Sequence, residues 1–148
     1  MESWISVQCS MLSWQLVHLK QIKMRFQDLL AYQKSFALAM KIYKVSMQFP
    51  KEETYSLTDQ VRRSSRSVTA NIAETYRKRD YSKNFHSKLT DSDTENSETQ
   101  VWLEFANSCE YITEPIFNEL IKDAEEVAKL INYMILNPQK FGVNSNNS

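Results

Sequence analysis

The fold is decided by residues 49–74, which read FPKEETYSLTDQVRRSSRSVTANIAE. The segment begins with Phe49-Pro50, and proline ends a preceding helix because it pushes the residue before it out of the helical region. After a turn, mostly apolar residues recur at helical spacing: Leu57, Val61, Ser65, Val68, Ile72 and Tyr76. The segment therefore predicts a core-facing helix, capped at its start by Thr54 or Ser56.

The predicted helix has two further faces. One carries the basic residues Arg62, Arg63, Arg66 and Arg77, opposite the core stripe. Between these two faces lies a strip of small or polar residues at spacings of four, three and four: Gln60, Ser64, Ser67 and Asn71. These side chains are too polar for a core and too regularly spaced for a random surface. We expect them to hydrogen-bond across a close contact with another helix or another subunit.

The remaining chain predicts three more helices. It has 148 residues, one glycine and three prolines, a composition that favours a single domain built from long helices. Apolar spacing places helices at about 26–47, 57–78, 80–112 and 114–136. Short connections between such helices are typical of an up-down-up-down antiparallel bundle. The predicted fold is therefore an all-α four-helix bundle over residues 24–137.

The other three helices also have an expected core face, which in the fourth helix is Ile116, Leu120, Ala124, Val127, Ile131, Met134 and Ile135. In the first helix we expect these residues to face the core: Leu29, Tyr32, Phe36, Ala39 or Met40, Tyr43 and Met47. In the third helix the expected stripe is Phe85, Leu89, Ser92, Asn96, Thr99, Leu103 and Ala106. Its middle is polar, and we expect Ser92, Asn96 and Thr99 to face the polar strip of the second helix.

The two ends of the chain differ from the bundle. Residues 1–23 are apolar, but their start lacks the basic residues of a signal peptide. They fit an added helix, a membrane-surface anchor or a translated upstream extension, and Met24 just before the first helix favours the extension. We expect residues 138–148 to form a disordered polar tail. No run of 18 apolar residues predicts a membrane span.

Charge is distributed unevenly although the net charge is zero. Residues 54–90 contain eight Lys/Arg and three Asp/Glu, whereas residues 91–126 contain one Lys and eleven Asp/Glu. This asymmetry indicates either a side that binds a polyanion or two adjacent helices that neutralise each other. The zero total favours neutralisation.

No residue pattern indicates catalysis or metal binding. Di-iron bundles use Glu-x-x-His motifs, but Gln15 precedes His18 at that offset and Lys83 precedes His86. The two cysteines lie far apart and have no metal-ligand spacing. We therefore expect a cytoplasmic, non-enzymatic protein without cofactor, metal or small-molecule substrate.

Four motifs resemble those of a known family: FxDLxxYQ over 26–33, FPxxExYxLxxQxRRS over 49–64, SVxxNIAE over 67–74 and SETQVWLEFA over 97–106. The chain resembles the four helix bundle protein family over residues 24–136. The founding members are encoded by intervening sequences in bacterial large-subunit ribosomal RNA genes. The resemblance implies a ring-shaped homo-oligomer, with homopentamers as the known arrangement.

One relative in this family is the accessory variability protein of diversity-generating retroelements, a basic pentamer that binds nucleic acid and a reverse transcriptase. The present chain departs from the family in two ways. Thr75 follows the Ala-Glu pair where glycine is common in the family, and the chain is neutral, without the basic balance of the retroelement relatives.

These observations give two sets of candidate site residues. The nucleic-acid-binding candidates, whose cationic groups suit phosphate oxygens, are Arg62, Arg66, Arg77, Lys78, Arg79 and Lys83. The candidates for a polar layer or subunit interface are Gln60, Arg63, Ser64, Ser67, Asn71, Glu98, Thr99 and Trp102. For Arg63 we expect an ion pair with Glu98, Glu95 or Glu74.

The preferred hypothesis is a self-assembling accessory or scaffold protein that binds structured RNA, another nucleic acid or a nucleic-acid-processing protein. The alternative is a purely structural or protein-interaction module with no nucleic-acid binding.

Overall fold

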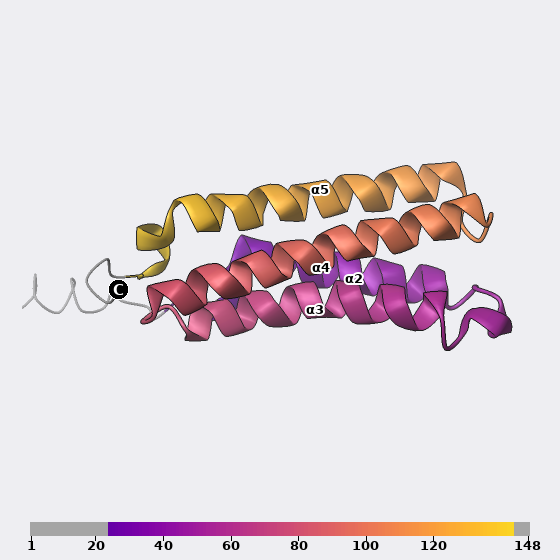
Figure 1. Cartoon of the computed structure of the whole chain (residues 1–148). Helices are drawn as coiled ribbons and strands as arrows, with labels where there is room; N and C mark the ends of the chain where they lie inside the picture. The colour runs from indigo at the N-terminus through magenta and orange to yellow at the C-terminus, as the bar shows by residue number, and fades with distance from the viewer. Residues whose placement is uncertain (1–23, 144–148) are drawn as a thin grey trace, which may run out of the picture.

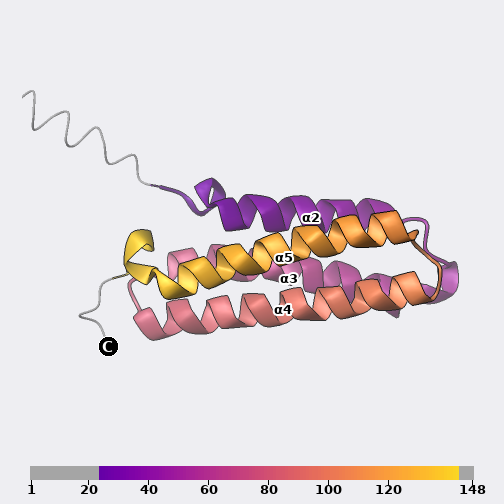
Figure 2. The same cartoon turned by 90° about the horizontal axis from the view of Figure 1, so that it is seen from above.

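Four α-helices lie antiparallel and side by side in the computed structural model, which describes residues 24–143 (Figures 1 and 2). They are α2 (Leu30–Ser46), α3 (Leu57–Arg77), α4 (Ser82–Ser108) and α5 (Glu114–Leu136). The main contacts join α2 to α3, α3 to α4, α4 to α5 and α5 back to α2. The predicted all-α up-down-up-down bundle is confirmed.

The bundle has two ends, which we name by what lies there. The terminal end is where α2 and α4 begin and where α3 and α5 end (Figure 1). The loop end holds the two longer connections, residues 47–56 and 109–113. Three short 3-10 turns complete the described chain: η1 (Phe26–Asp28), η2 (Lys51–Glu53) and η3 (Pro138–Phe141). Within the described residues, none of the helices combines the length and apolar character needed to span a bilayer.

The predicted core stripes of α3 and α4 are confirmed, since every residue assigned to them is buried. The polar middle of α4 is hydrogen-bonded. Thr99 Oγ1 donates to Ser64 Oγ at 2.9 Å, and Ser92 Oγ donates to a backbone carbonyl of α3 at 2.9 Å. Asn96 Nδ2 instead donates to the Ala124 carbonyl of α5 at 2.9 Å. The prediction that all three residues face α3 is therefore wrong for Asn96, because the polar stripe touches both neighbouring helices.

The predicted core face of α2 is wrong at Phe36 and Met47, and of the alternatives Ala39 and Met40 it is Ala39 that is buried. Phe36, Met40 and Met47 are 51%, 41% and 58% exposed. The side chains that α2 buries are mostly smaller: Ala31, Ser35, Leu38, Ala39, Ile42 and Ser46. The helix carries two apolar stripes, so its periodicity alone could not identify the buried one. Small side chains lie inward because α2 approaches α3 closely there.

The start of α3 also differs from the prediction. Neither Thr54 nor Ser56 caps the helix through its side chain; Glu53 does. The Glu53 carboxylate accepts hydrogen bonds from the Leu57 N–H at 3.2 Å, from the Ser56 hydroxyl, and from the Tyr111 hydroxyl at 3.1 Å. The hydrogen bonds from the Ser56 hydroxyl, the larger effect, and from the Leu57 amide keep the pKa of Glu53 below its ordinary value.

The packed part of the chain continues beyond the predicted boundary at residue 138. Residues 138–141 form η3, and Val143 is buried in the core with 6% of its surface exposed. Gly142 reverses the chain between them with a φ of +84°, a conformation that favours glycine. The tail prediction is thus wrong for residues 138–143. The predictions for residues 1–23 and 144–148 lie outside the described residues.

The corrected face of α2 can be tested by two alanine substitutions. We expect Ile42→Ala to lower the free energy of unfolding by about 2–5 kcal/mol, because Ile42 is only 1% exposed and its loss opens a cavity. Phe36→Ala should cost less than about 1 kcal/mol, because half of this side chain already faces solvent. Urea unfolding at low protein concentration measures both values. Equal losses for the two variants would restore the original prediction.

The Glu53 cap predicts a pH-dependent contribution to stability. A lowered pKa means that the fold favours the ionised carboxylate, so the contribution is complete above the ordinary pKa of 4.5 and is lost as pH falls through the lower folded value. We expect Glu53→Gln to melt below the wild type at pH 7 and at nearly the same temperature at about pH 3. A melting-temperature gap that does not change with pH would contradict the cap.

Candidate nucleic-acid interface

The arginines in the middle of α3 stack on a tyrosine of α2. The guanidinium carbons of Arg62 and Arg66 lie 4.9 and 5.7 Å from the centre of the Tyr43 ring. Arg62 Nε also donates to Ser46 Oγ at 2.7 Å. Stacking uses the face of a guanidinium and leaves its edge N–H groups able to donate. Arg66 is exposed, so these groups can reach a phosphate from solvent.

Arg63 has a carboxylate partner, as predicted. Its Nη2 lies 2.8 Å from Glu98 Oε1 on α4, and it also donates to Gln60 Oε1 at 3.0 Å. The same Glu98 oxygen accepts a hydrogen bond from Trp102 Nε1 at 3.1 Å. Arg63, Glu98 and Trp102 therefore form one contact between α3 and α4. Because half of the Arg63 side chain is exposed, this ion pair contributes little to stability.

Ser67 and Asn71, also in the predicted polar strip, are half-buried on α3. Within residues 24–143 their side chains have no hydrogen-bond partner. Their assignment to a polar layer or subunit interface stays a prediction, whereas Ser64 is placed inside the bundle by its bond to Thr99.

Two of the four candidates at the terminal end are engaged within the fold. Lys78 Nζ lies 2.7 Å from Glu74 Oε1. Lys88 Nζ lies 3.3 Å from the other oxygen of the Glu74 carboxylate. The hydrogen bond from Lys78, followed by the one from Lys88, lowers the pKa of Glu74. In return, Glu74 raises the pKa of Lys88. Arg79 lies over the Tyr76 ring at 4.3 Å and donates to the Tyr76 carbonyl at 2.7 Å. Lys78 and Arg79 therefore stabilise the end of α3 through these contacts.

Arg77 and Lys83 are exposed at the same end, on either side of the short connection between α3 and α4. Among the described residues, no carboxylate lies within 4 Å of either cation. Arg77 lines a hollow of about 450 Å³ together with Arg25 and Arg79. Arg25 is not among the candidates predicted from the sequence, and the fold brings it close to the end of α3.

The bundle is electrostatically polarised along its axis. Residues 24–33, 72–90 and 128–143 make up the terminal end and contain eight Lys/Arg and three Asp/Glu. Residues 42–61 and 99–118 make up the loop end and contain two Lys and six Asp/Glu. The eight cations of the terminal end are Arg25, Arg77, Lys78, Arg79, Lys83, Lys88, Lys129 and Lys140. A neutral protein therefore presents one basic end.

The interpretation that α4 neutralises the basic face of α3 is correct for one arginine. Glu98 pairs with Arg63, but in the described chain no acid of α4 lies within ion-pair distance of Arg62, Arg66 or Arg77. The second ion pair between these helices has the opposite polarity, since it joins a lysine of α4 to Glu74 of α3.

Two apolar surfaces are open on the sides of the bundle. The first, which we call the α2–α3 groove, has a volume of about 460 Å³. Its lining residues are Phe26, Tyr32, Phe36, Ala39, Met40, Arg66, Thr69, Ala70 and Ala73. The second, the α4 patch, consists of Val101 and Phe105, which are 46% and 53% exposed, with the Trp102 ring 5.8 Å from that of Phe105.

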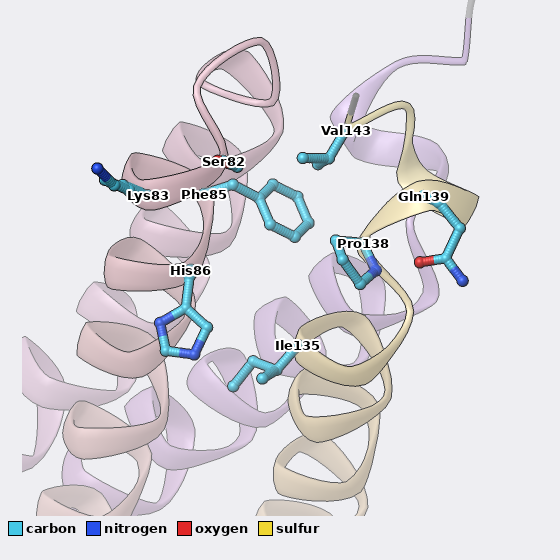
Figure 3. A pocket seen from close by; sticks show the side chains of 8 residues that line it. All are labelled: Ser82, Lys83, Phe85, His86, Ile135, Pro138, Gln139 and Val143. Atoms are coloured by element: carbon cyan, nitrogen blue, oxygen red, sulfur yellow. The ribbon is translucent and has the colours of Figure 1, made fainter. Parts of the chain in front are cut away.

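A further hollow, the terminal pocket, lies between the start of α4 and the end of α5 with η3, and has a volume of about 560 Å³ (Figure 3). It is lined by Ser82, Lys83, Phe85, His86, Ile135, Pro138, Gln139 and Val143. This pocket is not predicted by the sequence, because its two walls are about 50 residues apart in the chain. In the described residues no group of His, Cys, Asp and Glu could hold a metal ion.

The chain belongs to the 23S rRNA-intervening sequence protein family, whose sequence model matches residues 27–133. It is also similar to a solved structure of a protein with unknown function from the S23 ribosomal protein family of Bacteroides thetaiotaomicron. The two share 29% sequence identity with a TM-score of 0.64, over 72% of this chain and 98% of that chain. The comparison with curated proteins gives no match. The family predicted from the motifs is confirmed.

Proposed function

We propose that this protein is a non-catalytic, cytoplasmic accessory protein that self-assembles and binds structured RNA at its terminal end. The observation that carries RNA binding is the excess of cations there, with Arg77 and Lys83 free of carboxylate partners among residues 24–143. Polyanions bind such surfaces because each neutralised phosphate releases counterions. Arg62 and Arg66 extend the basic surface along α3.

RNA is favoured over other polyanions by the family, whose description refers to a sequence that interrupts 23S ribosomal RNA. The spacing of the cations is also suitable. Arg66 and Arg77 are eleven residues apart on one helix, a distance of roughly 16 Å at about 1.5 Å per residue. A folded RNA presents several phosphates over such a distance, whereas a small anion reaches only one of the two positions.

Self-assembly is supported by the two apolar surfaces on the sides of the bundle. The α2–α3 groove is concave and the α4 patch is exposed, so the patch of one copy can enter the groove of the next. A contact between two different surfaces closes into a ring when the rotation between copies permits it. A pentamer, the arrangement implied by the resemblance, is one such ring.

RNA binding predicts a salt-dependent affinity that requires the terminal end. We expect a labelled RNA hairpin to bind at low salt and to weaken steeply between about 50 and 200 mM salt. The double variant Arg77→Ala/Lys83→Ala should weaken binding and reduce the slope of log K against log salt by about 1.5. Fluorescence anisotropy across a salt series measures both quantities.

The matched control for this prediction is Lys44→Ala/Lys51→Ala, which removes the same charge from exposed positions at the loop end. Glu74→Gln provides a gain-of-function test, because it removes a negative charge and releases Lys78, while Lys88 keeps its ion pair with Asp91; this variant should tighten binding. No binding at low salt, or equal losses for the two double variants, would reject the RNA-binding proposal.

Self-assembly predicts a native mass that is a multiple of 17.4 kDa. We expect Phe36→Glu, which places a charge in the α2–α3 groove, to return the mass of one chain in light scattering. Leu136→Glu is the control, since this residue is 68% exposed and belongs to neither apolar surface. A single-chain mass for the wild type over a range of concentrations would exclude self-assembly and leave RNA binding to be judged separately.

A further inference from the structure

We propose that the terminal pocket holds one unpaired nucleotide of the bound RNA, with its base on the apolar floor and its phosphate at the basic rim. This inference rests on the proposed RNA binding and specifies the class of RNA. It predicts a ligand with a loop or a bulge rather than an uninterrupted duplex.

The floor of the pocket is apolar. Phe85 is 1% exposed and Val143 6% exposed, and Pro138 lies on the wall that faces Phe85 (Figure 3). The Phe141 ring packs against Phe85 with 6.5 Å between ring centres. The volume of about 560 Å³ falls within the range of small-ligand sites, roughly 300–1,000 Å³. A flat base in this hollow would lie against the half-buried Ile135 and Pro138, above the buried Phe85 and Val143.

The edge of the pocket offers groups that suit a base. Figure 3 shows the His86 imidazole and the Ile135 side chain extending toward each other from α4 and α5. An imidazole ring can stack on a base, as other aromatic rings do. Gln139 stands on the η3 side, and its amide can both donate to and accept from a base edge.

The electrostatics of the rim select an anion. Lys83 lines the pocket in the first turn of α4, a turn that contains no acidic residue, and its side chain extends outward from the rim (Figure 3). Because helix N-termini already favour anions, a lysine there strengthens attraction for a phosphate. None of the residues that line the pocket in the described chain is Asp or Glu. A ligand that combines a flat apolar ring with negative charge matches both halves of the site, and a nucleotide has this combination.

A paired base does not fit this site, because its ring is stacked and its edge is occupied within the duplex. RNA-binding proteins read sequence mostly from loops and bulges, where bases can be splayed out. The pocket also lies apart from the α2–α3 groove, since the two share no lining residue. Self-assembly through the groove and nucleotide capture at the terminal end are therefore compatible.

The test compares a labelled RNA hairpin with a blunt RNA duplex of the same stem. We expect the wild type to bind the hairpin about tenfold more tightly, the scale of one stacked base. Ile135→Trp fills the pocket and should abolish this preference while leaving duplex binding unchanged. Its control is Ile116→Trp at the loop end, where the residue is 37% exposed.

A second variant protects the test against misfolding. His86 is exposed, so His86→Ala should keep the melting temperature while reducing the preference for the hairpin several-fold; Asn84→Ala, on the exposed face nearby, should not change it. Equal binding of hairpin and duplex by the wild type, or a preference that survives both pocket variants, would overturn the inference and leave RNA binding intact. If neither RNA binds at low salt, both proposals fail together.

Discussion

The close approach of α2 and α3 determines much of the surface of this protein. Small polar groups meet between the two helices, where Thr69 Oγ1 donates to Ser35 Oγ at 3.0 Å. Phe36 and Met40 lie away from this contact and face outward, whereas Leu38 and Ile42 remain in the core. The groove proposed for self-assembly is thus a consequence of how tightly the bundle packs. An exposed apolar surface of this kind either binds a partner or lowers the solubility of the protein.

Antiparallel topology converts a sequence asymmetry into a spatial one. The connection between α3 and α4 is only four residues long, so the basic ends of both helices lie together. The acids of α4 continue toward the loop end, away from those cations. Two adjacent helices neutralise each other only where opposite charges lie at the same height along the bundle. Among the described residues, Arg63 of α3 and Glu98 of α4 are the one such pair between the basic stripe of α3 and the acids of α4. A total charge of zero therefore does not imply a neutral surface.

The sequence predicted the core faces of α3 and α4 because each has one stripe that contrasts with its surroundings. It failed for α2, where two apolar stripes compete and only the partner helix decides between them. The sequence did not predict the Glu53 cap. Glu53 lies three residues before the N-cap, and its carboxylate reaches the Leu57 amide only through the local turn and a hydrogen bond from Tyr111 in the other loop. It also missed the terminal pocket, because residues near 83 and 139 become neighbours only through the bundle topology.

Polarity along the axis also constrains how copies could assemble around RNA. A ring whose rotation axis runs parallel to the helices places every terminal end on one face and every loop end on the other. Such a ring would multiply the weak attraction of one basic end, because several sites acting on one RNA raise the effective concentration at each. Assembly with alternating orientations would instead bring basic and acidic ends together and cancel the field. If this protein binds RNA as an oligomer, its charge distribution favours the cyclic arrangement.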